Sequence, residues 1–388
     1  MTDWKTKLIH AGVHAPEGFK SLAEPVHRGS TVLFPSAGEQ RESWDHYEGG
    51  YSYGTHGTQT VLELASRICE LEGGYRTWIV PCGLASISLV NLALLSAGDH
   101  LLLPANVYGP SRRMAAKLLS RLGVEWSLYP PLAGEGIREY LRPNTRLVWC
   151  EAPGSVTMEV PDVPAMVRVA HEAGALVAVD NTWAAGVLFD ALGHGADVTM
   201  QALSKYVGGH SDLLLGSVTA SNAEIWQKLG DAHCILGLSV SPDEASLALR
   251  GLKTMAVRLD AIEARALELA RWLGEQPEIE RVLHPALESC PGHENWKRDF
   301  TGSSGVFSIV FREGTRKEQV HGFVDALKLF GIGYSWGGVS SLALTYDFTH
   351  SPERPVYGNR LVRLNIGLES VEDLRADLAQ ALLVGMGL

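Results

Sequence analysis

Residues 200–212 read MQALSKYVGGHSD, and residues 177–186 just before them read VAVDNTWAAG. The first stretch places Lys205 in an uncharged setting, with Ser204 beside it and paired glycines after it. The second stretch is an apolar run that ends at Asp180. Taken singly, the two residues would be ordinary: a surface lysine near a loop and an aspartate that caps a turn. Their combination has a more specific chemical meaning.

A lysine in apolar surroundings loses its charge readily and can form a Schiff base with an aldehyde. An acid at the end of a buried strand can hold a proton on a pyridine nitrogen. Pyridoxal phosphate (PLP) needs both groups from a protein. Lys205 and Asp180 therefore predict a PLP site.

The sequence around these two residues alternates between strand and helix patterns. From residue 76 to residue 220, short apolar runs such as HLLLP and TRLVWCE are separated by helical patterns such as SRRMAAKLLSRLG. Apolar strands that alternate with helices indicate an α/β fold with a mainly parallel sheet covered on both faces. Ligands of such sheets lie at the carboxyl ends of the strands, and Asp180 and Lys205 lie at or just past such ends.

The chain has 388 residues, which exceeds the roughly 250–300 residues of a single hydrophobic core. We expect an N-terminal arm with one short helix over residues 1–50 and a large cofactor-binding domain over 51–240. Residues 241–388 are expected to form a smaller α+β domain, entered through a long helix that begins near Pro242.

Charge and cysteine content exclude several classes of protein. The net charge of −11, from 33 basic and 44 acidic residues, argues against a nucleic acid or an anionic membrane as partner. The five cysteines are scattered and form no C-x-x-C pair, so we expect neither a disulfide framework nor a metal site. The N-terminus has no signal-peptide core, and we expect a cytoplasmic protein without a membrane span.

Three further residues are candidates for binding. Gly83 lies between a strand and a helix, where backbone N–H groups can face a phosphate, although many such turns contain glycine. Tyr108 follows a strand and could stack on a flat ring or be an ordinary turn residue. Arg363 lies inside an apolar strand, where its partner would be a substrate carboxylate or a nearby acid such as Glu369.

Other catalytic motifs are missing. The segment GHGADV (193–198) has Val198 where a dinucleotide-binding fingerprint needs its third glycine, which disfavours a nicotinamide-dependent dehydrogenase. His293 and Glu294 are followed by NWK rather than by x-x-His, so a zinc protease is unsupported. No G-x-S-x-G elbow of a serine hydrolase is present.

Long segments of the chain resemble the PLP-dependent transsulfuration enzymes, also called the Cys/Met metabolism family. They are VDNTWAAGVLF (179–189), SKYVGGHSD (204–212), HPALESCPGHENWKRDFTGSSG (284–305), YSWGG (334–338) and VRLNIGLE (362–369). The resemblance runs from about residue 5 to the C-terminus and is nearest to the bacterial cystathionine β-lyase branch. It implies the aspartate-aminotransferase fold (fold type I), with a seven-stranded sheet, in a homotetramer of two catalytic dimers.

The resemblance also implies roles for the cofactor-binding residues. Lys205 would carry PLP as a Schiff base, Asp180 would pair with its ring nitrogen and Tyr108 would stack on its ring. The phosphate would be held by two backbone N–H groups and one hydroxyl, from Gly83, Leu84 and Ser204.

The substrate residues follow from the same resemblance. Arg363, helped by Ser335, would bind the substrate α-carboxylate, and Tyr53 would reach into the active site of the neighbouring subunit.

Three features favour the β-lyase branch over its γ-acting relatives: Tyr334 and Trp336 around Ser335, and the pair Ser155-Val156 where relatives usually have Asn-Pro. The implied reaction is β-elimination on L-cystathionine, which gives homocysteine, pyruvate and ammonia on the way to methionine. The alternatives are a γ-acting member such as a cystathionine γ-lyase or γ-synthase, a broader cysteine-conjugate β-lyase, and a non-catalytic relative.

The chain departs from the family pattern at three positions. Thr55 replaces the arginine of a Tyr-x-Arg phosphate clamp, and Ala202 replaces a serine three residues before the lysine. We expect weaker PLP binding than is usual in the family, with His56 as a possible replacement for the lost arginine. Ser340 replaces a glutamate, and we have no physical account of that change.

Overall fold

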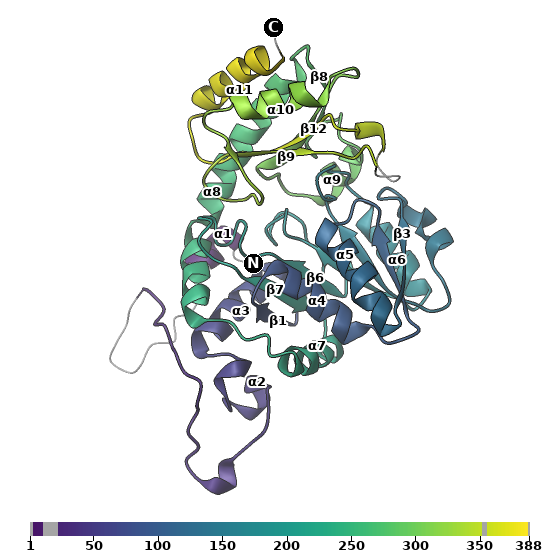
Figure 1. Ribbon diagram of the computed structural model, residues 1–388. Coiled ribbons are helices and arrows are strands. Elements are labelled where there is room, and N and C mark those ends of the chain that lie inside the picture. The colour runs from purple at the N-terminus through teal and green to yellow at the C-terminus, as the bar shows by residue number, and fades with distance from the viewer. Residues whose placement is uncertain (1–2, 11–21, 351–354, 387–388) are drawn as a thin grey trace.

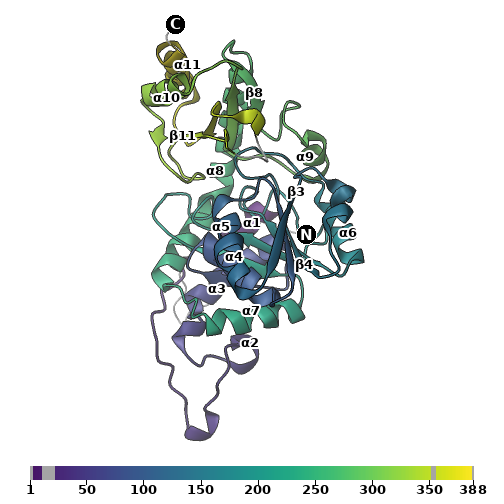
Figure 2. The ribbon, with the colours of Figure 1, turned by 45° about the vertical axis from the view of Figure 1, so that its right-hand side comes forward.

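A computed structural model describes residues 3–10, 22–350 and 355–386 of the chain. It has a large part built on one sheet and a smaller part built on a second sheet (Figure 1). The helix α8, Pro242–Gly274, runs from the large part into the smaller one (Figures 1 and 2). Among the described helices, none combines the length and apolar character needed to cross a bilayer.

The large sheet has seven strands in the order β1-β7-β6-β5-β4-β2-β3. β7 is antiparallel to both of its neighbours, β1 and β6, and all other neighbours in this sheet are parallel. The mainly parallel sheet predicted from the sequence is therefore confirmed. Its strands are β1 Arg76–Val80, β2 His100–Pro104, β3 Glu125–Tyr129, β4 Thr145–Glu151, β5 Leu176–Asp180, β6 Val198–Gln201 and β7 Gly216–Ala220.

Both faces of this sheet are buried, which explains the continuous apolar runs of its strands. In β2, Leu102 packs with α6 on one face, whereas Leu101 and Leu103 pack with α4, α5 and α7 on the other, as the two-residue period of a strand requires. The helices of this part are α3 Gln59–Glu72, α4 Gly83–Leu94, α5 Gly109–Lys117, α6 Val163–Glu172 and α7 Ala223–Ile235.

The second sheet has five strands in the order β10-β11-β12-β9-β8, packed with α10 (Lys317–Ala326) and α11 (Val371–Met386). The strands are β8 Ile279–Leu283, β9 Val306–Phe311, β10 Gly331–Ile332, β11 Leu342–Tyr346 and β12 Leu361–Asn365. The sequence shows strand patterns at IERVLHP (279–285), GVFSIVF (305–311) and LVRLNIGLE (361–369), which predict β8, β9 and β12 but not the other two strands. β10 has two residues, and β11 follows a glycine-rich turn that hides its strand pattern.

Several helices also differ from the prediction. α7 was not predicted; its cap is Asn222, whose side chain accepts from the Ile225 N–H at 3.0 Å, but Gly230 interrupts its helical pattern. α9, His293–Asp299, overlaps the segment WKRDFTGSSG (296–305), which the sequence predicts to be part of a loop. Among the residues that the structure describes before residue 51, there are two α-helices, α1 Trp4–His10 and α2 His46–Gly49, rather than one. The pattern ADVTMQALSK (196–205) predicts a strand, but β6 ends at Gln201, so Lys205 follows it in a turn.

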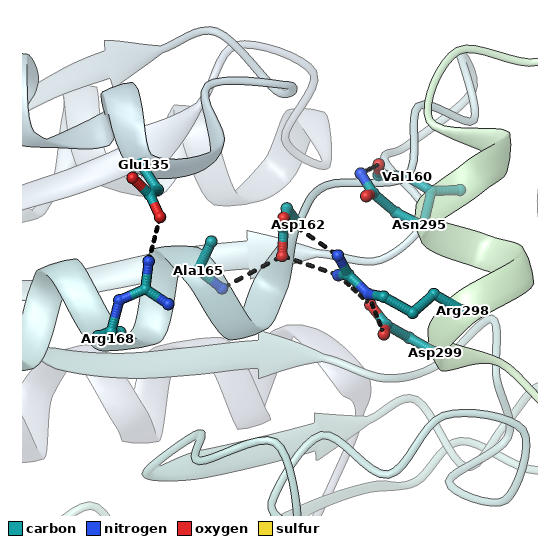
Figure 3. Close-up of polar contacts among 8 residues, drawn as sticks. All are labelled: Glu135, Val160, Asp162, Ala165, Arg168, Asn295, Arg298 and Asp299. Atoms are coloured by element: carbon teal, nitrogen blue, oxygen red, sulfur yellow. Dashed lines mark hydrogen bonds and ion pairs between the residues drawn. The ribbon is translucent and has the colours of Figure 1, made fainter.

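Hydrogen bonds and an ion pair connect α9 with the residues just before α6 (Figure 3). Asp162 caps α6 by accepting from the Ala165 N–H at 3.2 Å, as its sequence position predicted, and it also accepts from the Arg298 guanidinium at 2.8 Å. Asn295 Nδ2 donates to the Val160 carbonyl oxygen at 2.9 Å. These contacts join the C-terminal half of the chain to the large sheet's helical cover.

Candidate active site

Lys205 lies in a turn just after β6, facing the smaller part of the molecule. Its Nζ donates to Ser335 Oγ at 2.7 Å and lies 5.5 Å from the centroid of the Trp336 ring. Burial lowers the pKa of Lys205 to about 8; the positive charge of Arg363 adds to this, and Asp180 acts in the opposite direction. The lysine can therefore exist as a neutral amine near neutral pH, as nucleophilic and base chemistry require.

Asp180 is the last residue of β5 and is held by Thr182. The Thr182 N–H (3.0 Å) and hydroxyl (2.5 Å) both donate to Oδ1 of Asp180. The same hydroxyl accepts from the Ala202 N–H at 3.0 Å, which ties Asp180 to the segment that leads to Lys205. Burial raises the pKa of Asp180, while the bonds from Thr182 and the charge of Lys205 lower it.

The N-terminus of α4 lies against the segment before Lys205. Its cap residue, Cys82, makes no side-chain capping bond, and the first N–H groups of a helix have no acceptor within it. A Cβ at Gly83 would lie 2.6 Å from the Ala202 Cβ, so only glycine allows this close approach. A helix N-terminus of this kind suits a phosphate. Together with the partly buried acid Asp180 and a neutralisable lysine, it fits the requirements of PLP.

Two residues predicted to bind the cofactor, Ser204 and Tyr108, form hydrogen bonds within the protein. The Ser204 hydroxyl is paired with Leu215, donating to its carbonyl oxygen at 3.2 Å and accepting from its N–H at 3.1 Å, so its predicted phosphate contact would need a rearrangement. Tyr108 precedes α5, and its N–H donates to Glu151 at 2.6 Å. Burial and the nearby charge of Asp180 raise the pKa of Tyr108, so its phenol stays neutral at pH 7.

Arg363 lies in β12 without an acidic partner among the described residues. One of its nitrogens donates to the Ser335 carbonyl oxygen at 3.1 Å, and its Cζ lies 5.3 Å from the centroid of the Tyr346 ring. Glu369, which the sequence offered as an alternative partner, instead accepts from the Ser341 N–H at 2.8 Å and hydroxyl at 2.9 Å. The structural ion pair is therefore wrong, and the guanidinium fork is available to a carboxylate.

Ser335 connects Lys205 with Arg363 and occupies an unusual backbone conformation. Its φ of +84° is uncommon for a residue other than glycine and places it in a turn with local strain. Asn365 of β12 holds this turn, accepting from the Gly337 N–H at 2.8 Å and donating to the Ser340 carbonyl oxygen at 3.0 Å. Such strain at a site is typical of functional residues.

The two aromatic neighbours of Ser335 differ in exposure. Tyr334 is 84% exposed, whereas Trp336 is partly buried and packs against Tyr206 with ring centroids 5.5 Å apart. Trp336 is therefore placed beside Lys205, and Tyr334 lies at the surface around the site.

Tyr53 and its neighbours lie in a separate segment, before α3. Tyr53 forms a strand bridge with Thr31 and is 49% exposed, and no hydrogen bond joins it to Lys205 or Asp180 within the described residues. Its predicted role in a neighbouring subunit stays a prediction. Burial and the neighbouring His46 lower the pKa of His56, so its ring is neutral at pH 7 and a poor replacement for an arginine.

Three residues of the site were not found from the sequence: Thr182, Tyr346 and Asn365. Thr182 could have been found, because a hydroxyl two residues after an acid often bonds back to that acid. Tyr346 lies in β11, which was not predicted, so nothing in the sequence placed it near Arg363. Asn365 is a polar residue in an apolar strand and could have been marked as needing a partner.

Comparison with known proteins agrees with this geometry. The sequence model of the family of Cys/Met metabolism PLP-dependent enzymes matches residues 5–383 of this chain. The chain is 42% identical to the cystathionine beta-lyase of Escherichia coli (strain K12) over 381 residues, 96% of each chain. It is 41% identical to that of Salmonella typhimurium, with 98% of each chain covered.

Among solved structures, a cystathionine gamma synthase from Xanthomonas oryzae pv. oryzae in complex with cystathionine superimposes with a TM-score of 0.91. The identity is 30%, and the alignment covers 100% of this chain and 99% of that one. The chain therefore belongs to the family of Cys/Met metabolism PLP-dependent enzymes.

Proposed function

We propose that this protein is a carbon–sulfur lyase that eliminates homocysteine from L-cystathionine, with pyruvate and ammonia as the other products. The observation that carries the proposal is the arrangement of Lys205, whose Nζ is 2.7 Å from Ser335 Oγ, while the Ser335 carbonyl oxygen binds Arg363. A base and a carboxylate-binding cation are thereby joined through one residue.

PLP supplies an electron sink that stabilises negative charge at the substrate Cα. Lys205, Asp180, Tyr108 and the N-terminus of α4 are the groups that would hold it. Asp180 would keep its ring nitrogen protonated, and the partly buried position of Asp180 strengthens that electrostatic effect.

Arg363 would bind the substrate α-carboxylate and so place the Cα hydrogen near Lys205. Lys205 Nζ removes the Cα proton as a general base. The Cβ–S bond then breaks with its electron pair on sulfur, and Lys205 returns the proton to that sulfur as homocysteine leaves. Water hydrolyses the remaining three-carbon fragment to pyruvate and ammonia.

Two findings support β-elimination over γ-chemistry. Trp336 lies beside Lys205, as expected for the β-lyase branch. The two β-lyase relatives reported above are 42% and 41% identical to the chain, whereas the γ-synthase structure is 30% identical.

The homotetramer and a cytoplasmic location are part of this proposal. The described residues that precede α2, from residue 22 on, extend well away from the rest of the described chain (Figure 1), and Leu33 within them is 88% exposed. An extended segment with exposed apolar side chains suits contact with a second copy. Light scattering of the purified protein should give the mass of four chains, and a monomer would contradict this part.

The test of the catalytic role is Lys205→Ala with PLP supplied in excess. Turnover of L-cystathionine should be abolished, while PLP still binds non-covalently because its other contacts remain. The matched control is Lys253→Ala, because this lysine lies in α8 and bonds to the Leu22 carbonyl oxygen and Glu24. Activity retained in Lys205→Ala would remove the lysine from its role.

A further inference from the structure

Glu72 is a buried acid that the proposed reaction does not use. It is the last residue of α3 and is only 4% exposed. One of its carboxylate oxygens accepts from Gln201 Nε2, and the other accepts from Asn181 Nδ2 at 3.1 Å. A buried carboxylate is costly unless it is hydrogen-bonded, so its presence here calls for a role.

The two partners of Glu72 lie at the ends of the two strands that carry the active site. Asn181 directly follows Asp180 at the end of β5, and Gln201 ends β6, four residues before Lys205. The Asn181 N–H donates to the Met200 carbonyl oxygen at 2.9 Å, which continues the pairing of these strands. Glu72 therefore bridges the ends of β5 and β6, close in the sequence to Asp180 and Lys205.

A second bridge spans the same strand ends. The Thr182 hydroxyl bonds both Asp180 and the Ala202 N–H, as described above. This bridge reaches Asp180 directly, whereas Glu72 reaches it through the backbone of Asn181.

The packing around Glu72 leaves little freedom for its partners. A Cβ at Gly186, where φ is +69°, would lie 2.3 Å from Gln201 Nε2 and 2.9 Å from Glu72 Oε1. The Asn181 amide is fixed further by donating to the Phe189 carbonyl oxygen at 3.1 Å. Both amides are thus held with their N–H groups toward the carboxylate.

We propose that Glu72 is a positioning residue, whose carboxylate holds the ends of β5 and β6 so that Asp180 is aligned for the PLP ring. The inference rests on the PLP site and deepens it, but it does not depend on which substrate the enzyme cleaves.

The protonation of Glu72 gives the proposal a pH dependence. Burial raises the pKa of Glu72 to about 7, against the hydrogen bonds from Asn181, Gln201 and Thr199, and the charge of nearby Asp190 raises it further. The other titratable group that it affects is Cys69, one turn earlier on α3. The carboxylate accepts from both amides, whereas the protonated acid leaves one amide poorly paired.

The alignment of Asp180 and the contribution of Glu72 to folding stability therefore change in opposite directions with pH. Because the folded-state pKa of Glu72 is raised above its ordinary value of 4.5, its contribution to stability is fully present below pH 4.5 and is lost as pH rises through about 7. Alignment of Asp180 instead improves as Glu72 ionises.

The test is the dissociation constant of PLP for Glu72→Gln, measured by tryptophan fluorescence on the full-length apoenzyme. The variant keeps the size of the side chain but sets an N–H₂ group against an amide donor. We expect PLP binding to be about 10-fold weaker in the variant than in the wild type at pH 8. At pH 6 wild-type Glu72 is protonated and therefore uncharged, like glutamine. The ratio of variant to wild-type dissociation constants should then fall toward one. The ionisation of PLP itself cancels in this ratio.

A double-mutant cycle separates positioning from a general structural role. In an Asp180→Asn background, Glu72→Gln should weaken PLP binding less than two-fold further, because the group through which it acts is already lost. Equal effects in both backgrounds, or a ratio that does not change with pH, would overturn the proposal.

Two more variants control for the loss of a buried acid in general and for a failure of Glu72→Gln to fold. Asp377→Asn is the matched control, because Asp377 is a buried acid, 5% exposed, that accepts from the Lys328 and Leu329 N–H groups in the smaller part of the molecule; it should leave PLP affinity unchanged. If Glu72→Gln does not fold, Gln201→Met removes one donor without a clash and should weaken PLP binding in the same direction. Since PLP affinity is measured, failure of the proposed β-elimination would leave this test intact.

Discussion

Arg363 is held by an aromatic ring and a carbonyl oxygen rather than by an acid. Tyr346 and Arg363 are diagonal neighbours on one face of the β11–β12 pair, since Leu344 is opposite Arg363 and Tyr346 is opposite Leu361. A cation beside an aromatic face is stabilised without losing its hydrogen-bonding edge. Tyr346 thus orients the guanidinium while leaving it available to a substrate carboxylate.

Replacing Tyr346 by leucine should therefore weaken substrate binding. A desolvated cation–π contact is worth about 2 kcal/mol, so the KM for L-cystathionine should rise roughly 30-fold while kcat changes little. Steady-state kinetics of Tyr346→Phe provide the control, because the ring is kept and KM should stay close to that of the wild type. A fall in kcat with unchanged KM would argue against a role in carboxylate binding.

Thr55 is the departure from the family pattern with the clearest energetic meaning. A charge-assisted hydrogen bond contributes about 1.5–3 kcal/mol, so Thr55→Arg should tighten PLP binding by roughly 10-fold to 150-fold. Equilibrium dialysis of PLP measures this directly. Thr31→Arg adds the same charge to a neighbouring exposed position, and the prediction fails if Thr55→Arg gains no more affinity than that control.

At the scale of elements, Asp162 both caps α6 and pairs with α9. Burial alone would raise the pKa of Asp162, but the bonds from Arg298 and the Ala165 N–H outweigh it and hold the pKa below its ordinary value of 3.8. A depressed folded-state pKa means that the stabilisation is present above about pH 4 and is lost as pH falls through the folded-state pKa.

Two substitutions separate these contributions in urea denaturation at pH 7. Asp162→Asn keeps a good capping residue and loses only the charge, which should cost about 0.5–1 kcal/mol because Arg298 is half-exposed. Asp162→Ala also loses the cap and should cost about 1 kcal/mol more. The cost of Asp162→Asn should disappear below the folded-state pKa; equal costs for both substitutions would show that the cap contributes nothing.

The elements also show where sequence reasoning succeeded. The apolar strands of the large sheet were predicted because both of their faces are buried, which leaves a continuous hydrophobic signal. β11 was missed because partly buried residues such as Tyr346 carry a weak pattern. The domain boundaries after residues 50 and 240 stay predictions.

At the scale of the whole molecule, the active site is assembled from segments far apart in the chain. Lys205 and Asp180 come from the large sheet, and Ser335 and Arg363 come from the smaller part. The sequence predicted the first pair from local chemistry and marked Arg363 as a candidate from its place in an apolar strand, but the role of Ser335 depended on family resemblance. The bond between Lys205 and Ser335 could not be predicted locally, because it joins residues that the fold alone brings together.

The central claim is that these residues break the Cβ–S bond of L-cystathionine. The most direct measurement is the identification of products after L-cystathionine is added to the purified, PLP-loaded enzyme. The account predicts homocysteine with pyruvate and ammonia. Formation of cysteine with 2-oxobutyrate would contradict it, because that outcome would show γ-elimination despite Trp336 beside Lys205.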